Sequence, residues 1–151
     1  MSKLASMLRD EHGISVIELA LVLPVIILLV TAVTDIALGY GAKIALQQAT
    51  ARTIEKATAG GLNSAAFQLL QAEGAAAAGV AIDQVAVDKW LECNGVRQLL
   101  FDGVCPDGEQ VGRYISVTIT RTYTPTFSVM NWQSSPNGTW PLTSTSSVRV
   151  Q

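Results

Sequence analysis

GISVIELALVLPVIILLVTAVTDIALG, Gly13 to Gly39, is the apolar run that decides the fold of this chain. Its 25 residues from Ile14 to Leu38 would span about 37 Å as a helix, against a hydrocarbon core of about 30 Å. Glu18 and Asp35 are its only ionisable residues, one near each end, where both can reach a membrane interface. The run therefore predicts a transmembrane helix over residues 14–38.

Three kinds of N-terminal segment contain such a run. A secretory signal peptide has an apolar core of about 7–15 residues, and this one is longer. A plain signal anchor would merely tolerate Glu18. A prepilin-type leader is cut before the apolar segment, which is kept. The stretch G-I-S-V-I-E resembles a prepilin peptidase site, and a cut between Gly13 and Ile14 would make Glu18 the fifth residue of the mature chain. We favour this third interpretation.

Glu18 then has a specific role in assembly. A carboxylate in an apolar medium is costly unless it finds a charge partner. Cleavage would leave a free amine on Ile14, and in families with this motif the glutamate is thought to meet such an amine, often a neighbour's. The alternative is that Glu18 lies at the headgroup level and has no function.

Composition and charge exclude several classes of function. The chain has 151 residues, 49% hydrophobic and 15% charged, with a net charge of −2. Its basic residues are scattered, so we expect no nucleic-acid partner. The one histidine, His12, falls in the predicted leader, and no catalytic set can be assembled from the rest. We therefore expect neither an enzyme, nor a cofactor, nor a metal site.

The remaining sequence predicts an α+β head. Residues 42–59 are rich in helix formers and would continue the first helix outward until Gly60 and Gly61 end it. A short second helix is expected over 65–78. Alternation of β-branched residues predicts antiparallel strands, and Asn94-Gly95 is a hairpin signal between the first two. The strands are expected at 84–92, 96–101, 113–124 and 142–150.

These elements suggest four regions: a leader over 1–13, a transmembrane helix over 14–38, a helix extension over 39–60 and an extracytoplasmic head over 61–151. Residues 126–141 are rich in Ser, Asn, Pro and Trp and predict an irregular loop, under which we expect Trp132 and Trp140 to pack.

Cys93 and Cys105 lie twelve residues apart in a turn-rich region between strands. This spacing is compatible with a disulfide, and such bonds persist on the oxidising side of a membrane. Two unpaired cysteines in a cytosolic domain remain the alternative. The basic residues do not settle the orientation, because Lys3 and Arg9 precede the apolar run while Lys43 and Arg52 follow it. On the cysteines, we expect the head to lie outside the cytoplasm.

The N-terminal third resembles the TadE-like family. Members have a short leader, a glycine, an apolar start with a glutamate, an A-L-V-L-P segment, a later acidic residue and a helix containing glutamine. Here those places are occupied by Gly13, Glu18, residues 20–24, Asp35 and Gln47-Gln48. The usual aromatic residue after the glutamate is replaced by Leu19.

The resemblance implies a pseudopilin, or minor pilin, of the tight adherence (Tad/Flp) pilus system, with a role in pilus assembly, adherence and biofilm formation. It implies processing at Gly13–Ile14 and four classes of partner: the prepilin peptidase, other Tad pseudopilins and pilins, the assembly platform proteins and the inner membrane. The head would lie in the periplasm, with incorporation into an extracellular pilus left open. The alternative is a single-pass envelope protein, unprocessed and unrelated to pili, whose head binds a ligand or the cell wall.

Overall fold

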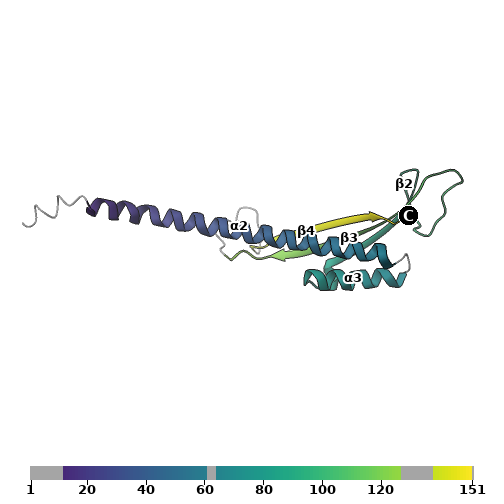
Figure 1. The fold of residues 1–151 in the computed structure, drawn as a ribbon, viewed down its shortest axis with the longest axis horizontal. Coiled ribbons are helices and arrows are strands. Elements are labelled where there is room, and N and C mark those ends of the chain that lie inside the picture. Colours follow the sequence, from purple (N-terminus) through teal and green to yellow (C-terminus); the bar gives the residue numbers. More distant parts are fainter. Residues whose placement is uncertain (1–11, 61–63, 127–137, 151) are drawn as a thin grey trace, which may run out of the picture.

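The protein consists of one long helix and a small head built alongside its C-terminal half (Figure 1). The structure, a computed structural model, describes the backbone of residues 12–60, 64–126 and 138–150, and side chains over 16–58, 69–126 and 138–150. Helix α2 spans His12–Gly60 and helix α3 spans Ser64–Ala78. A single 3-10 turn, η1 (Ile82–Gln84), leads into the sheet. The long apolar helix, the short second helix and the antiparallel sheet confirm the predicted α+β class.

The sheet has four antiparallel strands in the order β2-β1-β3-β4. They are β1 (Val85–Cys93), β2 (Val96–Gln98), β3 (Val111–Tyr123) and β4 (Trp140–Arg149). The expected hairpin turn is present between β1 and β2, with Asn94 at φ 49° and Gly95 at φ 80°. Both values lie in the left-handed region that Asn and Gly tolerate best, so this pair suits the tight turn.

Some strand limits differ from the sequence-based expectation. Strand β2 ends at Gln98 rather than continuing to Phe101, and β3 begins at Val111, two residues before the predicted start. Strand β4 begins at Trp140, so Trp140 and Pro141 belong to the sheet rather than to the loop. Proline is tolerated there because β4 is an edge strand. The predictions for Trp132 and for most of the 126–141 loop lie outside the described residues.

One face of the sheet forms the core. Alternate residues of β3 turn inward, and Ile115, Val117 and Ile119 have no exposed surface. Strand β1 adds Val85 opposite Ile119, and both helices cover this face. The opposite face carries the intervening residues, among them Thr118 and Thr145, whose hydroxyls hydrogen-bond at 2.9 Å. The head is thus two layers, helices on one face of a sheet.

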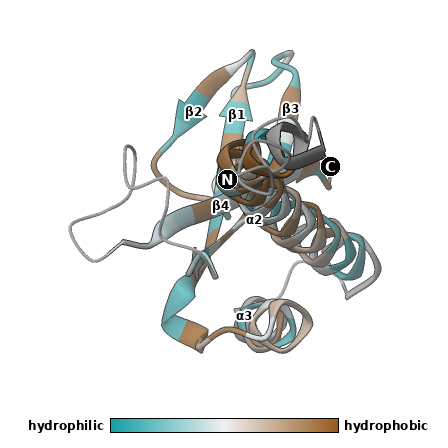
Figure 2. Ribbon diagram, turned by 90° about the vertical axis from the view of Figure 1, so that its left-hand side faces the viewer, coloured by the Kyte–Doolittle hydropathy of each residue, from teal (hydrophilic) through white to brown (hydrophobic). Residues whose placement is uncertain are grey.

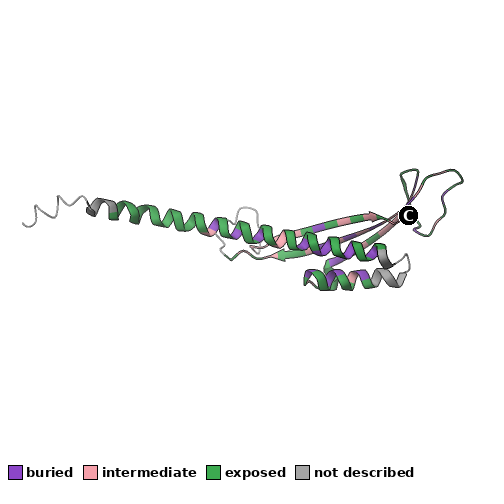
Figure 3. Ribbon diagram, viewed as in Figure 1, coloured by how far each residue is buried: buried purple, intermediate pink, exposed green. Residues whose placement is uncertain are grey.

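Helix α2 packs on the sheet through small side chains. Its buried residues recur every three or four positions, which places them on one side of the helix (Figure 3). They are Ala32, Asp35, Gly39, Leu46, Ala49, Thr50, Thr53, Ile54 and Ala57. The two buried threonines donate to the carbonyls four residues before them, Leu46 O and Ala49 O, each at 2.8 Å, so neither hydroxyl is unsatisfied.

Helix α3 ends at Ala78, the predicted limit, and a glycine follows it. Gly79 has φ 64°, and the Val80 amide donates to the Ala75 carbonyl at 3.0 Å. That bond, across five residues with a left-handed glycine inside it, is the Schellman ending of a helix. Gly74 on the same helix lies against Val85 and Thr53, where an added Cβ would come within 3.2 Å of Val85 Cγ1. The two helices and the sheet therefore meet most closely at Gly74.

Candidate functional site

The exposed, apolar half of α2 is the first candidate site. Residues 16–30 are all exposed, and one helix of the described part of the chain is long and apolar enough to cross a membrane. This end of α2 is hydrophobic (Figure 2) and its residues are exposed (Figure 3). Apolar side chains in such numbers are stable only out of water. The helix is consistent with a single membrane span.

The backbone and hydroxyl groups of this half are compatible with lipid. Thr31 Oγ1 donates to the Leu28 carbonyl at 2.9 Å, and Thr34 Oγ1 donates to the Val30 carbonyl at 2.8 Å. Pro24 lies inside the helix without ending it. Satisfied polar groups are what a segment in hydrocarbon requires.

The predicted processing and assembly residues lie close together on this helix. Gly13 and Ile14 are in its first turn, and Glu18 follows about one turn later, exposed to the surroundings of the helix. Within residues 16–30 Glu18 is the only ionisable residue. The geometry leaves its carboxylate accessible to a group from a second molecule. The predicted leader falls almost wholly outside the described residues.

The second acidic residue of the apolar run lies in a different environment. Asp35 is 5% exposed, and its side chain faces the head. Its carboxylate accepts a hydrogen bond from the Thr126 amide at 3.0 Å, and its backbone carbonyl accepts one from the Tyr123 hydroxyl at 3.5 Å. Sequence reasoning placed Asp35 only near a membrane interface. Its attachment to a residue 91 positions later leaves no signal in local sequence.

Next to Asp35, an aromatic pair joins the sheet to α2 at the end of the head nearest the apolar half of this helix. The rings of Tyr123 and Trp140 are 6.0 Å apart and tilted by 50°. A Cβ added at Gly39 would lie 3.4 Å from an atom of each ring, so the glycine lets both rings lie close to the helix backbone. Trp140 therefore packs, as expected, and among the described residues it lies against the helix at Gly39.

At the far end of the head, the predicted cysteine pair forms a disulfide. Cys93 and Cys105 have Cα atoms 5.5 Å apart and a sequence separation of 12. The bond closes a loop that contains β2, and it packs with Leu91 and Val111 in a small second core. Glu109 lies near the two sulfur atoms, but sulfurs joined in a disulfide are poor metal ligands.

The disulfide loop presents apolar side chains to solvent. Leu99 and Val104 are 104% and 93% exposed, and Leu100 is exposed beside them. Arg113 holds the loop in place, because its guanidinium donates to the Phe101 carbonyl at 3.3 Å and to the Gly103 carbonyl at 3.1 Å. An exposed apolar patch on an anchored loop is typical of a protein contact surface.

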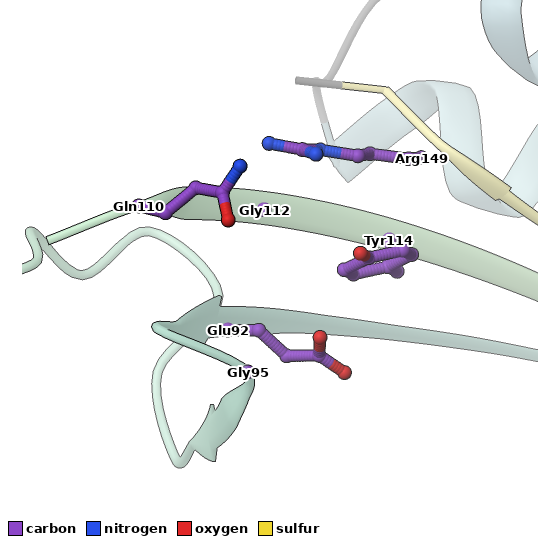
Figure 4. Close-up of a pocket in the computed structure, with 6 residues that line it drawn as sticks. All are labelled: Glu92, Gly95, Gln110, Gly112, Tyr114 and Arg149. Carbon is purple, nitrogen blue, oxygen red and sulfur yellow. The ribbon is translucent and has the colours of Figure 1, made fainter.

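A small open pocket lies at the same end, on the uncovered face of the sheet (Figure 4). It is lined by Glu92, Gly95, Gln110, Gly112, Tyr114 and Arg149. The Tyr114 ring lies over Gly112, where an added Cβ would come within 2.9 Å of the ring.

Two charged side chains of this pocket have partners within the protein. Glu92 Oε1 accepts from Trp90 Nε1 at 2.7 Å, and Arg149 Nη2 donates to the Val111 carbonyl. Trp90 stacks on Tyr114 with ring centroids 5.4 Å apart. Internal contacts therefore position Glu92, Arg149 and Tyr114 at the pocket.

Comparison with known proteins assigns the N-terminal region. Residues 13–54 match the TadE-like protein family, the range that contains Gly13, Glu18, Asp35 and the part of α2 that packs on the sheet. No curated protein and no solved structure matches the chain. The family resemblance found in the sequence is thus confirmed for these residues.

Proposed function

We propose that this protein, which carries a TadE-like domain at residues 13–54, is a membrane-anchored pseudopilin required to assemble Flp-type type IVb pili. Through those pili it would serve adherence and biofilm formation. The family suggests the Tad pilus context, and the single apolar helix is consistent with a membrane anchor.

The observation that carries the proposal is the coincidence of the family match with an exposed apolar helix bearing one exposed carboxylate. The match begins at Gly13, the residue before the proposed cut. Glu18 lies exposed in the same helix, in a segment with no other ionisable residue as far as Val30. A carboxylate there favours association with a cationic group, since it is costly unpaired in lipid.

In the proposed pathway the prepilin peptidase removes residues 1–13 and leaves the amine of Ile14. The mature subunit then associates with other Tad pseudopilins and pilins and with the assembly platform proteins in the inner membrane. The head lies in the periplasm, and Cys93–Cys105 is oxidised there. Ala- and Gly-bearing helix faces favour packing in lipid, because small residues let backbones approach.

The test is the intact mass of the protein extracted from membranes, in strains with and without the prepilin peptidase. We expect the mass to be lower by residues 1–13 only where the peptidase is active, and deletion of the protein to abolish piliation. Residues 1–13 still attached in a strain with active peptidase would contradict the proposal. That result would favour the alternative, an unprocessed envelope protein whose head binds a ligand or the cell wall.

A further inference from the structure

On α2, the last part of the apolar run overlaps with the first residues that contact the head. The apolar run of the sequence continues to Leu38, and Val33, Ile36 and Leu38 are exposed in the structure. Yet the head already contacts the helix at Ala32 and Asp35, both buried. Over residues 32–40, therefore, one side of the helix carries the described part of the head while apolar side chains on the other side are exposed (Figure 3).

The lengths of the two parts fit a bilayer. Residues 14–31, the part of the proposed mature helix before the first buried head contact, make about 27 Å of helix, close to the hydrocarbon core of about 30 Å. The overlapping residues 32–40 add about 13 Å. One headgroup layer is about 5–8 Å thick, half of the difference between the core and the full bilayer, so residues 32–40 are long enough to cross it.

The chemistry of the overlapping region is that of an interface. The head contributes the Tyr123–Trp140 pair there, and α2 contributes Tyr40, which is exposed. Tyrosine gathers at membrane surfaces because it joins an apolar ring to a polar tip, as the exposed Tyr40 does here, whereas the Tyr123 hydroxyl and the buried Trp140 Nε1 face the protein. Lys43 follows on α2 and donates to the Thr143 carbonyl of β4. Apolar, aromatic and basic residues thus follow one another along α2, the order found where a transmembrane helix leaves the membrane.

We propose that the lower end of the head lies within the lipid headgroup layer rather than above it. We define this end by residues 32–40 of α2 with Tyr123 and Trp140. Asp35 attaches it to the helix, and Val33, Ile36 and Leu38 face lipid on the other side. The occupant is lipid because these side chains continue the apolar surface of the membrane span on one unbroken helix. This inference rests on the membrane anchoring in the proposed function.

The experiment compares two isoleucines of α2, each replaced by cysteine in the full chain. Ile36 is 48% exposed and Ile44 is 43% exposed, so the structure alone predicts similar reactivity. The native cysteines are joined in a disulfide and do not react. The purified variants are reconstituted in phosphatidylethanolamine–phosphatidylglycerol vesicles and treated with a membrane-impermeant maleimide. We expect Ile36→Cys to react at least tenfold more slowly than Ile44→Cys, and the two rates to converge after solubilisation and unfolding.

Equal initial rates in vesicles would overturn the inference, because Ile36 would then face water. Protection that weakens as the protein is diluted in lipid would also overturn it, since a second copy would be the occupant. Flotation of the vesicles separates these outcomes from failure of the proposed function. A protein that does not float with lipid would contradict the anchoring itself, whereas one that floats but reacts equally at both positions contradicts only the depth of the head.

Discussion

At the scale of single residues, the two acids of the apolar run have different surroundings and so different expected roles. Glu18 is exposed on the bare half of α2, whereas Asp35 is buried against the head. A carboxylate is proposed to serve association at Glu18, whereas at Asp35 it accepts a hydrogen bond within the head. Substitutions at the two positions should therefore affect different measurements.

Glu18→Ala should leave membrane insertion and the stability of the head unchanged but abolish or strongly reduce piliation. The reason is that no contact joins Glu18 to the described residues of the head, and its proposed partner is on another molecule. Piliation is measured by quantifying sheared pili, and insertion by membrane fractionation. Leu19→Ala, an exposed neighbour without charge, is the control. Wild-type piliation in Glu18→Ala would remove the role proposed for this carboxylate.

Asp35→Ala should lower the free energy of unfolding of the head by about 1–3 kcal/mol, because the Thr126 N–H loses the hydrogen bond to the buried Asp35 carboxylate. Asp35→Asn should lose less, since its amide oxygen can still accept that bond. Thermal unfolding in detergent gives the stability. Hydrogen exchange at the Thr126 amide gives the local effect, and exchange as slow in Asp35→Ala as in the wild type would contradict the attachment.

At the scale of elements, the head depends on how closely α2 approaches the sheet and on how the disulfide loop is held. At Gly39, α2 lies close to the Tyr123 and Trp140 rings. At the opposite end of the sheet, the Cys93–Cys105 disulfide closes the loop. Between them, small residues on α2 face fully buried strand residues. Changes in side-chain volume on this face should be felt more than changes elsewhere on the helix.

Gly39→Leu should displace the Tyr123 and Trp140 rings and destabilise the head by about 1–3 kcal/mol, because the added side chain overfills a packed contact. Gly41→Leu is the matched control, since nothing lies within 4 Å of a Cβ at that position. It should be neutral or stabilising by up to about 1 kcal/mol, from helix propensity. Thermal unfolding followed by circular dichroism distinguishes them, and equal losses would contradict the packing.

Cys93→Ser with Cys105→Ser should lower the free energy of unfolding by about 3 kcal/mol, the entropic estimate for a closed loop of this size. The reduced loop should also expose Leu91 and Val111 more often, because the small second core is built around the bond. Urea unfolding of the wild type and the variant measures the difference. An unchanged midpoint would show that the loop is held by Arg113 and its carbonyl partners alone.

At the scale of the whole molecule, the two ends of the protein differ in their exposed surfaces. The apolar half of α2, the proposed anchor, is at one end, and the disulfide loop with exposed Leu99 and Val104 is at the other (Figure 1). The head is rigidly joined to the anchor, because α2 is unbroken and supplies part of the head's core. A contact made at the far end can thus be fixed in orientation relative to the membrane.

Protease added to spheroplasts should digest the head and leave the anchor, because we expect the head on the periplasmic side. Inverted membrane vesicles should protect it. Immunoblotting with an antibody to the head measures both, and a cytoplasmic protein serves as the control for intact cells. Digestion in inverted vesicles only would place the head in the cytoplasm and contradict the proposed orientation.

Much of this architecture follows from the sequence by itself. The apolar run fixes a long helix because only a helix satisfies its backbone in lipid, and period-two alternation fixes β3 and β4. Asn94-Gly95 and Gly79 mark a turn and a helix end, since both positions need a left-handed backbone. These are local preferences, expressed within a few residues of the signal.

Only the tertiary structure decided where the head begins and what holds it there. The burial of Asp35, its bond to the Thr126 amide, and the approach of Gly39 to Trp140 join residues about a hundred positions apart. The extension of β4 to Trp140 likewise depends on its pairing with Tyr123. No local pattern encodes such pairs, because each partner alone is compatible with several environments. Their energies arise only when the folded chain brings them together.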